Sequence, residues 1–268
     1  MISLSEIWLY PLKSARGIQL ASAELSPTGL AHDRRWMLVD PQGRFISQRE
    51  CPAMARLEVS VDSGQTGKLN FGWGSEQLQL ALPPYQLPHI EVQIWRSKVM
   101  AQLFDVGVNA WFSRALMREC RLVYLPDSSF RGTNPDVAPG QRVSFADGYP
   151  YLLCNQGSLD DLNQHLRAKG CPTVGIERFR PNLVVSGAKA FAEDNWKQIQ
   201  IGDIGFELVK PCERCVIIST DQHSGIVGSE PLQTLATYRR QAGKVIFGQN
   251  LVARLDCGQV KIADPVRV

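Results

Sequence analysis

The sequence has no long apolar run, no regular cysteine framework and no large excess of charge. No apolar stretch approaches the roughly 20 residues of a membrane-spanning helix, so we expect no membrane association. The start of the chain, Met1–Ile7, has no basic residue followed by a long apolar run, which argues against a signal peptide. The net charge of +3 is too small to predict nucleic-acid binding.

The seven cysteines are odd in number and irregularly spaced, which argues against a disulfide framework. This pattern fits a reducing, cytoplasmic location better than an oxidising one. The length of 268 residues and the hydrophobic content of 44% are ordinary for a globular protein with one large domain or two small ones. We therefore expect a cytoplasmic globular protein.

Short runs with strand character dominate the sequence. Apolar and polar residues alternate over Leu57–Val61 and Gln77–Leu82, as in half-buried strands, and the turn at Pro41–Gly43 separates two runs that predict a hairpin. Helical patterns are rarer, and the clearest are Val108–Leu116, Ser158–Asn163 and Pro231–Tyr238. The sequence therefore predicts a mainly β fold with a few helices, and a parallel sheet with crossover helices on both faces would contradict it.

A polar, turn-rich segment between Leu125 and Gln141 is the best candidate for a domain boundary or a mobile loop. We therefore expect two domains, residues 1–125 and residues 126–268. Ligand sites favour the space between domains, so we expect the functional site between two β-rich lobes.

The most informative segment is Lys210–Asp221, where Cys212 and Cys215 are separated by two residues between β-prone runs. Arg214 directly precedes the second thiol, and a neighbouring cation raises the thiolate fraction of a cysteine. Thiolates are soft ligands that suit soft metals. Cys215 is therefore the best candidate for a reactive or metal-bound sulfur.

Three simpler interpretations of the two cysteines stay open. A structural zinc site needs four ligands, and the other cysteines and the four histidines form no matching pattern. A thioredoxin-like redox pair opens a helix, whereas Val216–Ile218 favour a strand. An inert cysteine in a core strand is the commonest fate of a single thiol.

Polar clusters stand at the ends of three predicted strands: Pro11–Gly17, Asp33–Arg35 and Phe179–Asn182. Their lysine, serine, arginine and asparagine side chains offset charge and donate hydrogen bonds, as a phosphate monoester requires. Each cluster taken alone is more often an exposed, solvated loop. Spacing in the sequence does not show whether the clusters converge.

Five ordered motifs resemble one family across nearly the whole sequence: Tyr10–Ser14, Gly29–Val39, Arg178–Gly187, Phe191–Trp196 and Cys212–Cys215. The closing segments Phe247–Asn250 and Ile262–Val266 fit as well. On these motifs the sequence resembles the MOSC proteins with an N-terminal MOSC β-barrel domain. That family includes the mitochondrial amidoxime-reducing component and a bacterial reductase of N-hydroxylated bases. The resemblance implies a MOSC β-barrel packed against an N-terminal MOSC β-barrel-like domain.

The resemblance also implies a molybdenum cofactor, a pterin dithiolene (molybdopterin) with a terminal phosphate. The metal ligand of the family is the cysteine of the Arg-Cys dipeptide, here Cys215, and an all-sulfur donor set suits such a soft site. Arg214 would act beside this ligand, while Cys212 matches a cysteine that is not a ligand. The residues that match cofactor-binding positions are Lys13, Ser14, Arg34, Asn155, Arg180, Asn182 and Arg214.

By resemblance we expect a molybdenum-dependent oxidoreductase that removes oxygen from small N-hydroxylated substrates. The alternatives are a carrier of sulfur or of the molybdenum cofactor without turnover, and a cofactor-free β-barrel with an inert cysteine. The sequence contains neither a pyridoxal phosphate domain nor the cysteine pattern of an iron–sulfur domain. Electrons are therefore expected from a separate donor protein of the ferredoxin or flavoprotein type.

Two positions depart from the pattern of the family. Ala15 replaces a common cysteine, which excludes a redox role there. The segment Ile218–Gly225 lacks a proline and a second acidic residue, so substrate specificity is expected to differ. His223 in this segment is either a proton donor that replaces a carboxylic acid or, more commonly for such surroundings, an exposed loop histidine.

Overall fold

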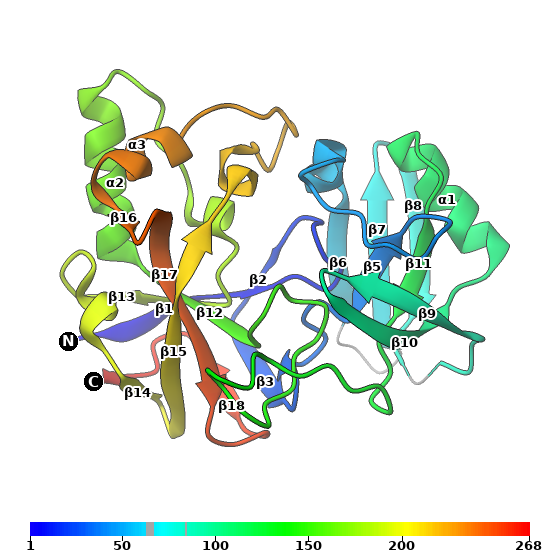
Figure 1. The fold of residues 1–268 in the computed structure, drawn as a ribbon, viewed down its shortest axis with the longest axis horizontal. Helices are drawn as coiled ribbons and strands as arrows, with labels where there is room; N and C mark the ends of the chain where they lie inside the picture. The colour runs from blue at the N-terminus through cyan, green and yellow to red at the C-terminus, as the bar shows by residue number, and fades with distance from the viewer. Residues whose placement is uncertain (63–66, 84) are drawn as a thin grey trace.

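The computed structural model describes residues 1–62, 67–83 and 85–268. The chain folds into two β-rich lobes that lie side by side (Figure 1). The lobe on the left of the figure contains both chain ends and is called the terminal lobe; the lobe on the right, residues 36–124, is called the middle lobe. The mainly β fold with a few helices is confirmed.

The terminal lobe is built on one mixed sheet, whose strands in the described residues follow the order β19-β14-β15-β17-β12-β13-β1-β2, with β16 paired to β17. The strands of this sheet are β1 (Ser3–Leu9), β2 (Ile18–Leu20), β12 (Tyr151–Asn155), β13 (Leu183–Ser186), β14 (Gln198–Ile201), β15 (Ile204–Arg214), β16 (Arg240–Gln241), β17 (Lys244–Ala253) and β19 (Val266–Arg267). A second sheet of this lobe consists of β18 (Gln259–Lys261), β3 (Ser22–Ser26) and β4 (Gly29–Leu30). Alternate apolar residues such as Ile7, Leu153 and Phe206 are fully buried between these layers.

The middle lobe contains two antiparallel sheets and one α-helix. The first sheet consists of β5 (Trp36–Val39), β11 (Arg121–Tyr124), β10 (Ser97–Leu103) and β9 (His89–Ile94). The second consists of β6 (Glu58–Asp62), β7 (Lys68–Trp73) and β8 (Glu76–Ala81), and a short 3-10 helix, η1 (Pro52–Arg56), precedes it. The helix α1 (Val106–Leu116) packs Phe112 edge-on against Phe71, with ring centroids 5.1 Å apart. The apolar spacing that predicted this helix is therefore the face that enters the core.

The two other predicted helices are also confirmed, as α2 (Gln156–Ala168) and α3 (Leu232–Tyr238), which pack together on the terminal lobe. They are joined by the rings of His165 and Tyr238, which stack with centroids 4.3 Å apart. Three 3-10 helices complete this lobe: η2 (Ile176–Phe179), η3 (Ala192–Asn195) and η4 (Val216–Ser219).

The strand expected directly after Cys215 was wrong, because these residues form η4. Ladder pairing of β15 ends at Arg214, and the amide of Ile218 then bonds back to the carbonyl of Cys215. The turn places Ile218 in the core at 3% exposure while Val216 faces solvent. Burial of one apolar side chain has outweighed the β propensity of the run.

The N-terminal strands belong to the terminal lobe, where β1 pairs with β2 and also with the distant β13. β1 runs antiparallel to β13, and the chain then crosses to the middle lobe, where the amide of Lys13 bonds to the carbonyl of Trp36. A division of the chain at residue 125 stays a prediction. The pairing shows that both chain halves contribute to the sheet of the terminal lobe.

The polar segment after Leu125 carries the chain back between the lobes. Arg131, only 6% exposed, donates to the backbone carbonyls of Ser144, Ala146 and Asp147. A buried guanidinium with several carbonyl acceptors fixes a loop that has little regular structure. The segment expected as a boundary or mobile loop is therefore held by an internal arginine.

The seam between the lobes contains a reciprocal pair of buried amides. The Gln48 side chain donates to Gln222 Oε1 at 3.1 Å, and Gln222 donates back to Gln48 Oε1 at 3.2 Å. Gln48 also donates to the carbonyl of Ser14, and Gln222 to that of Thr220. Both glutamines are almost completely buried, so neither amide can exchange its partner for water.

We expect Gln48→Ala to lower the free energy of unfolding by about 1–3 kcal/mol, because the buried Gln222 amide is left without its partner. Urea unfolding of Gln48→Ala, Gln222→Ala and the double variant should give a coupling energy of about 0.5–3 kcal/mol. Gln77→Ala, at an exposed position of β8, is the control and should change stability by less than about 0.5 kcal/mol. A coupling energy near zero would show that the pair does not join the lobes.

Candidate functional site

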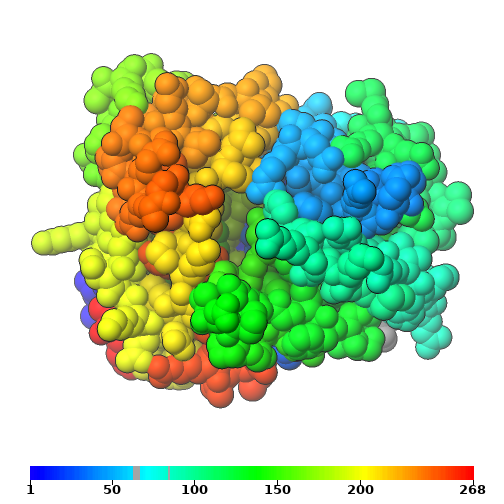
Figure 2. All heavy atoms as spheres, viewed as in Figure 1, coloured from blue at the N-terminus to red at the C-terminus, as the bar shows by residue number. Residues whose placement is uncertain are grey.

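A cleft of about 510 Å³ lies at the junction of the two lobes. It corresponds to the hollow near the centre of Figure 2, between segments that are far apart in the sequence. Every predicted site residue except Asn155 lines it: Lys13, Ser14, Arg34, Arg180, Asn182, Arg214 and Cys215. The polar clusters that spacing alone could not join therefore converge.

Two arginines of the cleft share one aromatic ring. The guanidinium carbons of Arg34 and Arg180 each lie 4.3 Å from the centre of the Tyr10 ring. Arg34 also donates to Asp33 at 2.5 Å and to Asn182 Oδ1 at 3.0 Å. The ring faces and the buried Asp33 carboxylate lower the repulsion between two neighbouring cations.

The backbone at this point adopts the left-handed conformation. φ is 68° at Ser14, 47° at Arg34 and 55° at Arg180. A non-glycine residue in this region costs on the order of 1–3 kcal/mol, and such residues cluster at functional sites. The strained backbone turns three polar side chains toward one cleft.

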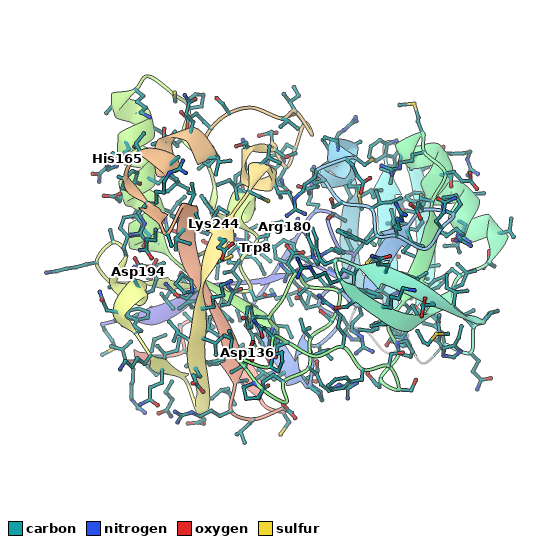
Figure 3. All side chains as sticks on the ribbon, viewed as in Figure 1. Trp8, Asp136, His165, Arg180, Asp194 and Lys244 are labelled. Carbon is teal, nitrogen blue, oxygen red and sulfur yellow. The ribbon has the colours of Figure 1, made fainter. Side chains whose placement is uncertain are left out.

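Arg180 has hydrogen-bonding capacity left over. Burial lowers the pKa of Arg180 to about 10, so it stays cationic at neutral pH. Its Nη1 donates to the carbonyl of Ala15 at 2.7 Å, whereas its buried Nη2 has no acceptor among residues 1–62, 67–83 and 85–268. In Figure 3 this side chain lies where the two lobes face one another. A buried cationic donor without an acceptor suits an anionic ligand that supplies one.

Lys13 adds a second buried cation. Its ammonium donates to the carbonyl of Phe145 at 2.9 Å and to Asp147 at 2.6 Å. Burial lowers the pKa of Lys13 to about 8, although the Asp147 carboxylate opposes this shift. Partial desolvation raises the pKa of the Asp147 carboxyl, but the Lys13 ammonium outweighs this effect and holds the pKa well below its usual range.

The two motif cysteines also line the cleft. Cys215 Sγ accepts a hydrogen bond from Arg49 Nη2 at 3.1 Å, and Arg49 belongs to the middle lobe. Burial raises the pKa of the Cys212 thiol, so this cysteine stays protonated at neutral pH. Of the two thiols, Cys215 is the one that contacts a cation from the opposite lobe.

Arg214 directs its guanidinium into the protein. It donates to the backbone carbonyls of Phe247 and Phe179 at 2.8 Å each. It also lies 3.8 Å from the sulfur of Cys154, whose pKa burial raises to about 12. These bonds fix the backbone directly before Cys215, which supports a positioning role for Arg214.

Asn155 is not brought to the cleft. Its side-chain oxygen caps α2 by accepting from the amide of Gly157 at 3.0 Å, and its amide donates to Glu193 at 2.9 Å and to the carbonyl of Lys189. Asn155 is fully buried at the end of β12, so its polar atoms serve the fold. The resemblance placed a polar residue here correctly, but the geometry gives no support to a cofactor contact. His223 is exposed on its loop, as the more common interpretation predicted.

The sequence analysis missed Asp147, Arg49 and Trp95, which also line the cleft. Asp147 accepts from the Trp95 indole at 3.2 Å as well as from Lys13. Asp147 lies in a turn-rich run and Trp95 at a hairpin turn, where polar and single aromatic residues are common. Arg49 follows a short polar run that resembles a solvated turn, so no local signal identified it.

The residues of the cleft fit the expected cofactor. One part offers two buried cations and an unpaired guanidinium nitrogen, which suit a terminal phosphate. Another part offers an accessible thiol, which suits a metal already bound by sulfur. A β-rich protein with this cleft is suited to hold a pterin dithiolene across both lobes.

Comparison with known proteins identifies the family. The family model described as MOSC N-terminal beta barrel domain matches residues 1–119, and the MOSC domain model matches residues 140–267. The chain is 31% identical to the mitochondrial amidoxime-reducing component 1 of Mus musculus, covering 98% of this chain and 81% of that protein. The chain therefore belongs to the MOSC proteins with an N-terminal MOSC β-barrel domain, a family related to the molybdenum cofactor.

Two further relatives define the similarity. The human mitochondrial amidoxime-reducing component 1 is 28% identical over 98% of this chain and 82% of that protein. A molybdenum cofactor sulfurase of Oryza sativa subsp. japonica is 36% identical over 92% of this chain. The chain spans about a third of the length of the sulfurases it matches, 32% for the rice protein. Within the described residues, no helix is both long and apolar enough to cross a membrane.

We expect sulfate affinity to fall roughly tenfold as the pH rises through about 8, because Lys13 is a cation below its pKa and neutral above it. Sulfate is the probe because its own charge does not change in this range. Lys13→Arg keeps its charge, so its affinity should stay constant. Calorimetric titrations on both sides of the pKa measure the difference, and a pH-independent affinity of the unmodified protein would contradict the role of Lys13.

Asn155→Ala is expected to lower the free energy of unfolding by about 1–3 kcal/mol, because α2 loses its cap and the buried Glu193 loses a donor. Sulfate affinity should stay within about twofold, since Asn155 does not reach the cleft. Lys13→Ala, by contrast, should weaken sulfate binding, because Lys13 lines the cleft. Loss of sulfate binding in a folded Asn155→Ala protein would show that Asn155 does contribute to ligand binding.

Proposed function

We propose that the protein is a molybdenum-cofactor-dependent oxidoreductase that reduces small N-hydroxylated compounds. The observation that carries this proposal is the Cys215 thiol, which contacts Arg49 of the opposite lobe in a cleft whose remaining charge is mostly cationic. The similarity to amidoxime-reducing components over almost the whole chain supports the same function.

The cations of the cleft would hold the phosphate end of the cofactor. Lys13 is buried, as is the Nη2 atom of Arg180, which has no acceptor among the described residues and would take an anionic oxygen. Asn182 is 1% exposed and accepts from Arg34, so it orients Arg34. Ser14 lines the same part of the cleft and would add a hydroxyl donor.

Cys215 would be the protein ligand of the metal. Arg214 holds the backbone before it through two carbonyl bonds, and this limits the movement of the thiol. When bound, a molybdenum dithiolene supplies oxygen-atom removal coupled to two-electron transfer. The protein supplies position and charge around that chemistry.

The overall reaction consumes two electrons and two protons for each N–O bond that is cleaved, and it releases the amine-type product and one water molecule. The electrons would come from a separate donor protein of the ferredoxin or flavoprotein type. The cleft opens to solvent at the Asp147 side, where the carboxyl side chain is 62% exposed, so protons can arrive through water.

A second candidate function is the transport of sulfur or of the cofactor on this site without turnover. The 36% identity to a molybdenum cofactor sulfurase favours it. Mass spectrometry would detect a persulfide on Cys215 in a sulfur carrier. Elemental analysis of protein made in a molybdate-supplied host, combined with a reductase assay, separates a cofactor carrier from an enzyme.

Cys215→Ser is expected to abolish reduction of N-hydroxylated substrates, because a neutral alcohol is a weaker and harder donor than a thiolate toward this metal. Much of the pterin should stay bound, since the cations of the cleft are unchanged. Cys212→Ser is the matched control and should keep most of the activity. Molybdenum content and substrate reduction with a supplied electron donor are measured for both variants.

The two outcomes that oppose this assignment are distinct. Equal loss of activity in both variants would favour a redox disulfide between the two cysteines. Full activity in Cys215→Ser would exclude this sulfur as the metal ligand.

A further inference from the structure

Arg49 is a cation of the cleft that lies beside Cys215, the proposed metal ligand, rather than in the proposed phosphate part. Its Nη2 is 3.1 Å from Cys215 Sγ, although 166 positions separate the two residues in the sequence. A guanidinium carries five N–H donors. Within the described residues, this contact is the only hydrogen bond of Arg49, and no carboxylate forms an ion pair with it.

The surroundings of Arg49 hold its side chain in place. The guanidinium carbon lies 4.7 Å from the centre of the Trp95 ring, and Trp95 is itself fixed by its bond to Asp147. The Phe45 ring packs against Trp95 with centroids 4.7 Å apart. Because the side chain is already ordered by this stacking, binding of a ligand costs it little conformational entropy.

The backbone of Arg49 is fixed from the other direction. The preceding residue, Gln48, is locked into the reciprocal amide pair with Gln222. Gln222 follows Cys215 by one short 3-10 turn and its connecting residues. The backbone next to Arg49 is therefore held close to the segment that follows Cys215 by a buried contact between the lobes.

We propose that Arg49 is a substrate-binding residue that selects hydroxamic acids over amidoximes, an inference that rests on the reductase function proposed above. A hydroxamic acid presents two neighbouring oxygen acceptors, which match the planar, donor-only fork of a guanidinium. An amidoxime replaces one of these oxygens by a nitrogen that carries donors, and a guanidinium cannot accept from it. Trp95 is the positioning residue that holds the fork at the cleft.

The test compares benzhydroxamic acid with benzamidoxime, which share the same ring and differ in this one group. Arg49→Gln in the molybdenum-loaded enzyme should lower kcat/KM for benzhydroxamic acid by about tenfold or more, mainly through KM. The value for benzamidoxime should change by less than about threefold. Arg49→Lys keeps the charge but loses the fork, so it should also lose most of the preference.

Arg56→Gln is the matched control. Arg56 also belongs to the middle lobe and stacks on a tryptophan, with its guanidinium carbon 4.8 Å from the Trp73 ring, but it does not line the cleft. This variant should keep both kcat/KM values. Any general effect of removing a stacked arginine would appear in it equally.

Two readouts do not depend on turnover. Molybdenum content should be the same in the unmodified protein, Arg49→Gln and Arg56→Gln. Benzoate, an unreactive two-oxygen ligand of the same shape, should bind the loaded Arg49→Gln protein about tenfold more weakly by calorimetry. Retained molybdenum together with weakened benzoate binding assigns Arg49 to the substrate rather than to the cofactor.

The remaining outcomes separate this inference from the proposed function. An unmodified, molybdenum-loaded protein that reduces neither compound would overturn the reductase function, while the benzoate titration still tests Arg49 as a binding residue. Reduction of both compounds with no change of preference in Arg49→Gln would overturn the role of Arg49 alone. Loss of molybdenum in Arg49→Gln would also overturn it, because Arg49 would then be a cofactor contact.

Discussion

Repulsion between like charges shapes the cleft between the two lobes. Lys13, Arg34 and Arg180 all line one cleft, where close cations repel each other more strongly than in water. The protein offsets this with a shared aromatic ring, with the buried carboxylate of Asp33 and with Asp147. The balance leaves a net positive cleft in which, among the described residues, the buried Nη2 atom of Arg180 has no acceptor, and this suits an anionic ligand.

The path of the chain follows from this arrangement. β1 belongs to the sheet of the terminal lobe, yet the residues directly after it turn toward the middle lobe and supply Lys13 to the cleft. The return segment, held by the buried Arg131, supplies Asp147 as the partner of that lysine. Each lobe closes one side of the cleft, so neither lobe contains the complete site, and the amide pair of Gln48 and Gln222 keeps the two sides in register.

Much of the fold was predictable because its signals are local. The apolar spacing of Val108–Leu116 identified α1, and alternation over Gln77–Leu82 identified β8, since both patterns reflect one buried face. The strand predicted over Val216–Ile218 was wrong, because β-branched residues favour strands whereas the burial of Ile218 requires a turn. Asn155 caps α2, because a polar residue at the end of a strand serves equally well as a helix cap as it does in a site.

Local patterns in the sequence predict the class of fold, the family motifs and Cys215 as the sulfur of interest, because each of these depends on residues that are close together in the chain. Which side chains share the cleft depends instead on how the two lobes pack. Arg49 lies 166 positions from Cys215, and Gln48 lies 174 positions from Gln222. Periodicity and propensity act over a few residues, so they carry no information about such pairs. The pairs arise only when the packing of both lobes brings the two ends of the chain to one seam.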